Sequence, residues 1–422
     1  MTLAESAARL IDQAPPWLRD RRSAGAEKLA DLEMPSPADE VWRYVDLGFD
    51  LANYPAAAGP GAQLARGTWV TALAAQSGSA VLVDGHVVDV ASDHGVTVAA
   101  AGSESVATIR DRVGTTLEPG RDIFTAAHAA FSPEGLVVHV ARNTAVTDPV
   151  VVDAQAATAG TSAYPHITVV LERNSEASIV IVYRSPDDTD LVHVPHVEAF
   201  VDDGARLRIT SVQVLGSDVR SVGSQQVVLG RDASARLGEI GLGAGFSRLR
   251  LGIDLDGAGS SFNGSGLYFG DRDQVHDYRV FITHRGPRTS SDLFLKGAVE
   301  DSAQAVWTGL VRIEGTATGT TAFETNRNLV LSDGAKVNSV PNLEILTDDL
   351  QCGHGSSSGP LEEEHLYYLM SRGINRERAE RLLVRGFFEE IIQTLPTDAL
   401  ADPIRTAVYE KFVAAQEAGR VL

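Results

Sequence analysis

The sequence predicts a mainly β protein, a right-handed parallel β-helix (a β-solenoid) between an N-terminal α/β module and a C-terminal helical module. Three observations support this fold class. Short β-like runs follow one another from about residue 123 to residue 350 without a convincing helix between them. Turn clusters of similar form separate many of these runs at nearly regular intervals, as expected of repeat architectures. Helical patterns begin after Pro360.

The N-terminal region, residues 1–122, combines helical and hairpin patterns. Residues 3–32 have apolar side chains at helical spacing, interrupted by Pro15 and Pro16. A further helix is expected at Pro37, because proline suits the first turn of a helix. Residues 80–88 read as two strands around the Asp84-Gly85 turn. The region is therefore expected to be a mixed helical and hairpin module.

The central region, residues 123–350, has the pattern of stacked strands. Residues 206–212 alternate polar and apolar side chains, the period of a strand with one buried face. A solenoid explains a recurring corner better than a β-sandwich does, and the sandwich is the alternative. The proposed corners are acidic, Asn or glycine turns followed by small residues: Asn174-Ser175, Asp203-Gly204-Ala205, Asp232-Ala233, Asp256-Gly257-Ala258, Asp301-Ser302-Ala303 and Asp333-Gly334-Ala335.

The C-terminal region, residues 351–422, is expected to be helical. Glutamates at 362–364 follow Pro360, where negative charge stabilises the first turn of a helix, and Gly373 is a suitable end for it. Asn375 can cap a second helix that ends before Pro396. A last helix is expected from about residue 401 to residue 418. This module could cover the end of the solenoid or dock another protein.

Cys352 is the only cysteine of the chain, and His354 follows it two residues later. Thiolate and imidazole are ligands that transition metals favour, and the glycines at 353 and 355 let the backbone approach closely. Two ligands cannot complete a tetrahedral metal site, so we expect a half-site that another chain completes. A buried structural cysteine is the alternative suggested by residue type alone.

Acidic pairs elsewhere are interpreted as solvated turns rather than catalytic sites. These pairs are Asp271 with Asp273 and Asp348 with Asp349. The sequence has no Walker-type phosphate loop and no Gly-x-Ser-x-Gly nucleophile elbow. An ATPase or an esterase activity of this chain therefore has no residue to support it.

Two histidine-containing stretches are also interpreted without a catalytic role. His193 and His196 are close in the sequence, and Pro195 lies between them. The proline predicts an extended segment with structural histidines whose rings point apart. His276, Asp277 and His284 lie in a polar stretch, where we expect a surface or interface role. Alternation places His276 and His284 on the same face of their strand.

Composition restricts the partners and the compartment. The chain has 422 residues and a formal net charge of −20, with a pI of about 4.9. Such a charge argues against nonspecific binding to nucleic acid or to an anionic membrane. A single cysteine cannot form an internal disulfide, and neither a secretory signal nor a membrane-spanning run is visible. We expect a cytoplasmic protein.

Read with its neighbours, the Cys-x-His stretch resembles the signature of the SufB/SufD family of iron–sulfur assembly proteins. The resemblance covers most of the chain and is specific from about residue 271 to residue 388. It is carried by NRNLVLS (326–332), PNLEI (341–345), DD (348–349), CGHG (352–355), LYYLMSRGI (366–374) and GFF (386–388), with weaker matches at 290–297, at Trp307 with Gly309, and at EVWRY (40–44). The Cys-x-His-Gly form, the length and the scarcity of cysteine are more similar to the SufD branch than to the SufB branch.

The resemblance implies a β-helix between helical end modules and two partner proteins. A SufB-like chain would share the site that contains His354 and Cys352, which would hold iron or a nascent cluster transiently and none stably alone. A SufC-like ATPase would dock on the C-terminal helices, and a homodimer is open for the chain in isolation. The chain itself would catalyse no bond-making.

Six residues of these helices are the expected partner-binding residues: Leu366, Tyr367, Leu369, Leu382, Phe387 and Phe388. Two alternatives stay open. The chain could be a SufB-like scaffold itself, which co-purified partners would reveal. It could also be a carbohydrate-active β-helix enzyme, which would require a cluster of carboxylates along one face of the coil.

Overall fold

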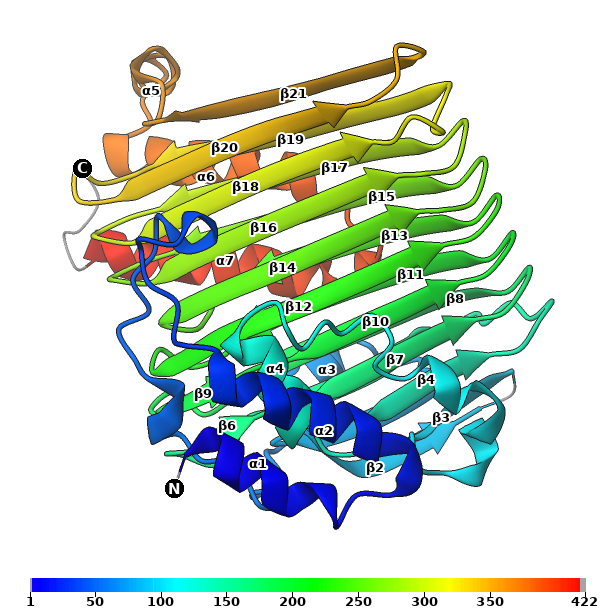
Figure 1. The fold of residues 1–422 in the computed structure, drawn as a ribbon. Helices are drawn as coiled ribbons and strands as arrows, with labels where there is room; N and C mark the ends of the chain where they lie inside the picture. Colours follow the sequence, from blue (N-terminus) through cyan, green and yellow to red (C-terminus); the bar gives the residue numbers. More distant parts are fainter. Residues whose placement is uncertain (1, 94, 418–422) are drawn as a thin grey trace.

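Two sheets of mainly parallel strands face each other and form a β-solenoid in the computed structural model, which describes residues 2–93 and 95–417 (Figure 1). From β10 onward, successive strands alternate between the two sheets, so each turn of the solenoid contributes one strand to each. Every strand from β10 to β21 pairs in parallel with the strand one turn away. The predicted parallel β-solenoid is therefore confirmed, and the sandwich alternative is wrong.

The first sheet has ten strands and the second has eleven. In the order of the chain, the strands of the first sheet are β1 (Gly78–Val83), β2 (His86–Ser92), β5 (Val150–Gln155), β8 (Glu176–Arg184), β11 (Arg206–Val214), β13 (Ser234–Gly241), β15 (Ser261–Gly270), β17 (Ser290–Val299), β19 (Thr320–Val330) and β21 (Leu350–Gly359). Those of the second sheet are β3 (Val96–Ala100), β4 (Leu136–Val140), β6 (Ser162–Ala163), β7 (His166–Leu171), β9 (Leu191–His193), β10 (His196–Val201), β12 (Val219–Leu229), β14 (Phe246–Leu255), β16 (Val275–His284), β18 (Gln304–Ile313) and β20 (Lys336–Ile345).

One corner of each turn is made by a residue with left-handed backbone. Asn174, Gly204 and Asp232 have φ of 57°, 69° and 54°, a conformation that Gly, Asn and Asp adopt most readily. The next residue is small and buried, as at Ala205 and Ala233. A backbone hydrogen bond of 2.8 Å from Gly204 N–H to the carbonyl of Arg231 joins successive turns. The predicted corners at Asn174, Gly204, Asp232 and Asp301 contain such a residue, the Asp256 cluster has it at Gly259, and the cluster at Asp333 has none.

The hydrophobic core fills the space between the sheets. Because side chains alternate along a strand, every second residue of both sheets points into this interior. Ile179, Ile209 and Leu237 lie at matching positions of β8, β11 and β13 and are almost fully buried. Their removal from water is the main favourable contribution to stacking the turns.

N-terminal helices cover the outer face of the second sheet. They are α1 (Leu3–Ile11), α2 (Pro16–Asp31) and α4 (Ile123–Phe131), with the 3₁₀ turns η1 (Glu40–Trp42), η2 (Leu51–Asn53) and η3 (Glu104–Arg112). The short helix α3 (Thr68–Thr71) packs at the first sheet. Two expectations were wrong here. The helix expected at Pro37 is only the turn η1, and α4 opens a region expected to lack helices. All residues of α4 are buried, so it has no polar face from which helical periodicity could be recognised.

Two C-terminal helices, α6 (Arg376–Ile392) and α7 (Ala401–Glu417), pack on the outer face of the first sheet, with the 3₁₀ turn η4 (Asp398–Leu400) between them. Helix α5 (Glu363–Ser371) contacts α6 instead. The Asn375 side chain accepts a 3.1 Å hydrogen bond from Arg378 N–H, as expected of a helix cap. Helix begins just after Pro360, as expected, but residues 351–359, which were assigned to the helical module, belong to β21. None of the described helices has the length and apolar character that crossing a bilayer requires.

Candidate functional site

The solenoid ends in two strands, each of which has a neighbour on one side only. β20 is the last strand of the second sheet and pairs with β18, while β21 is the last strand of the first sheet and pairs with β19. Both lie at the upper edge of Figure 1. Within the described residues, this end of the core has no further strand on it. Cys352 and His354 both belong to β21.

Cys352 and His354 point toward the interior of this last turn. They are two residues apart on a strand, so they share one face. The register places Cys352 beside Ala322 and His354 beside Glu324 of β19, and both of these β19 residues are buried. Cys352 packs at the margin of the interior core, and the Ser356 hydroxyl on the same face lies 2.6 Å from that of Ser339 on β20.

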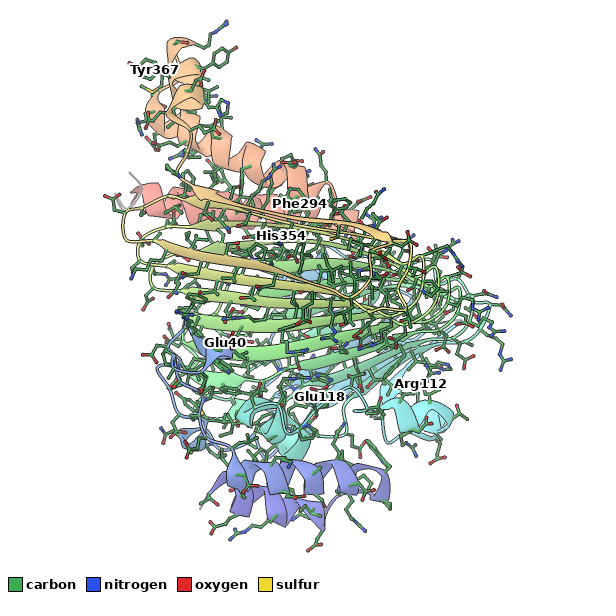
Figure 2. All side chains as sticks on the ribbon, turned by 45° about the horizontal axis from the view of Figure 1, so that its top comes forward. Glu40, Arg112, Glu118, Phe294, His354 and Tyr367 are labelled. Atoms are coloured by element: carbon green, nitrogen blue, oxygen red, sulfur yellow. The ribbon has the colours of Figure 1, made fainter. Side chains whose placement is uncertain are left out.

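The two candidate ligands are accessible from the open end. Cys352 is half-buried, and His354 is exposed on the outermost turn (Figure 2). No group of three or more His, Cys, Asp or Glu residues in the described part of the chain is arranged to hold a metal ion. The residues present therefore supply at most two of the ligands that iron or an iron–sulfur cluster takes from protein.

A buried carboxyl lies beside this pair and was missed from the sequence. Glu324 is 1% exposed, neither carboxyl oxygen has a hydrogen-bond partner among the described residues, and burial raises its pKa to about 7. A side chain at Gly309 would run into Glu324 and Trp307, so the carboxyl lies against that glycine. Alternation through Ala322 and Glu324 on β19 was the signal that could have identified it.

The interior becomes polar toward the open end. The Asn328 amide donates a 2.6 Å hydrogen bond to Asn326 Oδ1, which also accepts one of 3.0 Å from the Ser339 hydroxyl. The Asn326 amide in turn lies 3.2 Å from the Tyr268 hydroxyl. These groups replace the aliphatic side chains that fill earlier turns, and they line the approach to the Cys352 face.

The acidic pairs and histidines noted in the sequence lie elsewhere. His193 contacts the ring of Tyr183, whereas His196 contacts His128 and His166, so the two rings point apart as expected.

The surface role expected for the stretch around His276 is wrong, because His276, Asp277 and His284 are all fully buried. His276 and His284 do share the inward face, as alternation predicted. Asp273 is exposed, but Asp271 is buried and forms a 2.6 Å ion pair with Lys411, so it is not a solvated turn residue. A strand covered on both faces shows no polarity signal that separates inside from outside. Asp348 and Asp349 are exposed.

The six expected partner-binding residues fall into three groups, buried, exposed and half-buried. Leu366 and Phe388 are 1% exposed and pack within the chain itself. Tyr367 and Leu382 are 75% and 41% exposed, and the label on Tyr367 in Figure 2 lies on α5, which stands away from the solenoid. The remaining two, Leu369 and Phe387, are half-buried. Tyr368 and Met370, which the sequence did not single out, extend the exposed apolar surface.

Lys296 fixes helix α6 to the sheet. Its ammonium group donates a 2.7 Å hydrogen bond to the carbonyl of Phe387 and pairs with Glu390, both on α6. It also lies 4.4 Å from the centroid of the Phe387 ring. Burial lowers the pKa of Lys296, while Glu390 opposes that shift. Lys296 therefore joins β17 to the helices that carry the exposed apolar residues.

Comparison with known proteins gives one family. The model of the SUF system FeS cluster assembly SufBD core domain matches residues 153–387. An iron–sulfur cluster assembly SufBD family protein of Mycobacterium tuberculosis H37Rv is 33% identical over 385 residues, which cover 89% of each chain. The iron–sulfur cluster assembly protein SufD of Bacillus subtilis is 29% identical over 301 residues, 68% of this chain and 66% of the relative. SufD of Escherichia coli K12 is 29% identical over 185 residues, 44% of each chain.

Proposed function

The chain belongs to the SufBD family of SUF-system iron–sulfur cluster assembly proteins, and from that premise we propose that it is the SufD-like member of a SufB–SufC–SufD complex. In this role it acquires iron and supports new cluster assembly at its interface with a SufB-like chain. The proposal rests above all on one observation, the position of Cys352 and His354 on the interior face of an open last turn.

The half-site needs a second chain to be completed. Cys352 supplies a thiolate and His354 an imidazole, a ligand pair that suits iron or a forming cluster as cargo. The outer edges of β20 and β21 also have unpaired backbone donors and acceptors, which invite pairing with a strand of another chain. A SufB-like solenoid that abuts this end would bring further ligands to the same place.

The C-terminal helices are proposed as the docking surface for the SufC-like ATPase. Helices α5 and α6 expose four large apolar side chains, those of Tyr367, Tyr368, Met370 and Leu382. Exposed apolar surface of this kind is typical of protein–protein contacts. Lys296 and Phe388 connect α6 to the sheet, so movement of the helices would reach the solenoid. ATP hydrolysis by the partner would open or close the shared site through this connection.

The chain is proposed to be non-catalytic, cytoplasmic and without a stably bound cofactor of its own. The high negative charge leaves protein chains, rather than nucleic acid or anionic membrane, as the expected partners. In isolation the same open end could pair with a second copy, giving a homodimer whose two half-sites are alike.

Iron counting with and without partners tests the half-site. We expect trace iron and sulfide in the chain purified anaerobically alone, and stoichiometric iron and sulfide after co-expression with a SufB-like chain and a SufC-like ATPase. The reason is that two protein ligands hold iron too weakly to survive purification. Stoichiometric iron in the isolated chain would contradict the proposal, and co-purification with no second SufBD family member would favour a SufB-like scaffold.

A further inference from the structure

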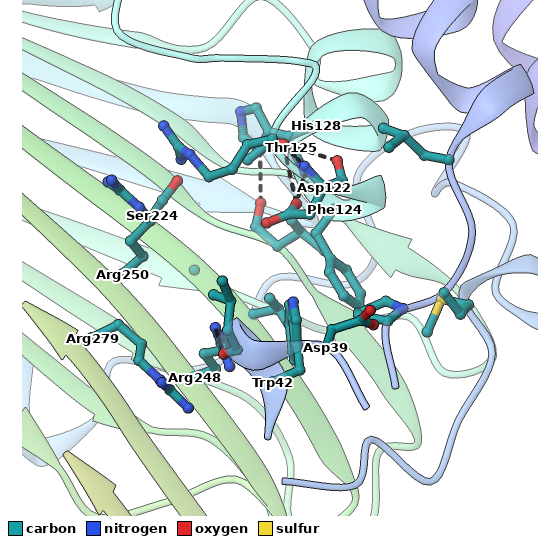
Figure 3. Close-up of a pocket in the computed structure, with 18 of the residues that line it drawn as sticks. Asp39, Trp42, Asp122, Phe124, Thr125, His128, Ser224, Arg248, Arg250 and Arg279 are labelled. Carbon is teal, nitrogen blue, oxygen red and sulfur yellow. Dashed lines mark hydrogen bonds between the residues drawn. The ribbon is translucent and has the colours of Figure 1, made fainter. Parts of the chain in front are cut away.

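A cavity of about 730 Å³ lies on the outer face of the second sheet, which is not the sheet that contains Cys352. Its floor is formed by β12, β14 and β16, and its walls by α4 and the segment around Trp42 (Figure 3). This volume is in the range of small-molecule binding sites. Nothing in the proposed handling of iron uses it.

Arginines are concentrated on the floor of this cavity. Arg250 on β14 and Arg279 on β16 are partners in the strand register, so two like charges lie side by side. Such neighbours repel each other unless another charge compensates them. Arg248 pairs with Asp277 at 2.7 Å, and the same carboxylate accepts a 2.7 Å hydrogen bond from Arg279 Nε. The Asp277 carboxylate thus pairs with two guanidinium groups.

Some of the remaining donors have partners: Arg248 Nη2 donates a hydrogen bond to the Val41 carbonyl, and Arg279 Nη1 donates one of 2.9 Å to the Thr308 hydroxyl. Two groups are left without an ion pair or acceptor among the described residues. Arg279 is 4% exposed, and its Nη2 has no hydrogen-bond acceptor among the described residues. Arg250 forms no ion pair with any described residue, and its guanidinium carbon lies 4.4 Å from the centroid of the Phe281 ring. Burial, and then the positive charge of Arg121, lower the pKa of Arg250 to about 10. The floor is therefore short of negative charge.

Acidic residues near the floor offset its charge only in part, because none of them forms an ion pair with Arg250. Asp122 caps α4, where its carboxylate accepts a 2.8 Å hydrogen bond from Thr125 N–H. Glu118 pairs with Arg121 at 2.8 Å. Asp31, Glu33, Asp39 and Glu40 also line the cavity and are exposed to solvent. The floor therefore has two guanidinium groups, of Arg250 and Arg279, whose charge the protein compensates only in part.

We propose that this cavity binds a small phosphate ester, with its phosphate on Arg250 and Arg279. The planar guanidinium fork matches phosphate oxygens in a bidentate geometry, which favours phosphate over a simple halide. The organic part would lie beside the ring of Phe281, which lines the cavity and is only half-buried. The site is independent of the proposed half-site at Cys352.

Titration calorimetry on the full chain tests this inference, with AMP, inorganic phosphate and adenosine as probes at constant ionic strength. AMP should bind more tightly than inorganic phosphate, and adenosine should not bind. Arg250→Gln should weaken AMP binding by about tenfold or more, because each good charged bidentate contact is worth at least that factor. Arg250→Lys should weaken it less, since the charge remains.

Arg231→Gln is the matched control, because Arg231 is an exposed arginine at a corner outside the cavity. It makes the same change in net charge and should leave AMP binding unchanged. Circular dichroism should show all three variants folded. Equal losses in the Arg250→Gln and Arg231→Gln variants, or no AMP binding to the unaltered chain at millimolar concentration, would overturn the proposal. Equal affinities for AMP and phosphate would show that the organic group makes no contact, and the cavity would then be a site for free phosphate.

Discussion

Replacing Phe388 with alanine should lower the free energy of unfolding by about 3–5 kcal/mol, the usual cost of truncating a buried phenylalanine. The Phe388 ring is 1% exposed and stacks on Phe269 of β15, with centroids 6.0 Å apart. Phe412 of α7 also contacts the Phe269 ring, with centroids 6.5 Å apart. Its loss leaves a cavity where α6, α7 and the sheet meet.

Guanidinium denaturation measures this effect, and Leu382→Ala is the matched control on the same helix. Leu382 is 41% exposed, so its truncation should change stability by no more than about 0.5 kcal/mol. If Leu382 belongs to the docking surface, its variant should instead weaken binding of the ATPase partner. Equal stability losses in the two variants would show that the helices do not pack on the sheet as described.

The chain should lose stability steeply as pH falls below about 6.5. Burial lowers the pKa of His193 and His276 to about 3 and that of His284 to about 4. Above pH 6.5 these groups are neutral in both the folded and the unfolded chain. Below it the unfolded chain binds protons that the folded chain cannot, so each histidine costs about 1.4 kcal/mol per pH unit. Three further histidines shift in the same direction through burial: His128, His166 and His196.

Two buried carboxyls oppose this trend in part. Burial raises the pKa of Glu239 to about 8 and that of Glu324 to about 7, so the folded chain takes up their protons first and gains stability as pH falls toward 4.5. Six histidines against two carboxyls leave a net loss of about 1.4–5 kcal/mol per pH unit.

Denaturation at pH 7.5, 6.5 and 5.5 measures this slope. His276→Gln should reduce it by about 1.4 kcal/mol per pH unit, because one buried titrating group is gone. His365→Gln is the control, since that side chain is 62% exposed, and should leave the slope unchanged. A stability that does not change between pH 7.5 and 5.5 would contradict the assigned burial of these histidines.

Repetition made the fold predictable. Each turn needs a left-handed corner, and the residues that tolerate one, such as Asn174, Gly204 and Asp232, recur along the chain. Alternation placed His276 and His284 on one face correctly, whereas the strand that contains Cys352 and His354 was not predicted. Helix α4 was missed, because a helix that is apolar on all sides lacks the periodic pattern on which helix prediction depends.

The candidate site was only partly predictable, for a related reason. Cys352 and His354 are close in the chain, so their type and spacing are visible in the sequence. Glu324 lies beside them only because β19 pairs with β21 in this register, and no local sequence pattern predicts that register. The arginine-lined cavity depends on a still longer separation: Arg248 donates a 2.8 Å hydrogen bond to the carbonyl of Val41, from a strand more than two hundred residues later.

The central claim is that the last turn of this solenoid contributes ligands to a metal site shared with a second chain. His354 is the more exposed of its two ligands, and Gln351 on the same strand points to the opposite face, which makes Gln351→Ala the matched control. Both variants should assemble with the SufB-like and SufC-like partners, because neither side chain is needed to fold β21.

Iron and acid-labile sulfide counted per anaerobically purified complex give the most direct measurement. We expect His354→Ala to lower both by about tenfold or more, the range seen when groups that support a metal ligand are removed, with Gln351→Ala at the level of the unaltered complex. Full iron and sulfide in an intact His354→Ala complex would mean that the metal is held elsewhere.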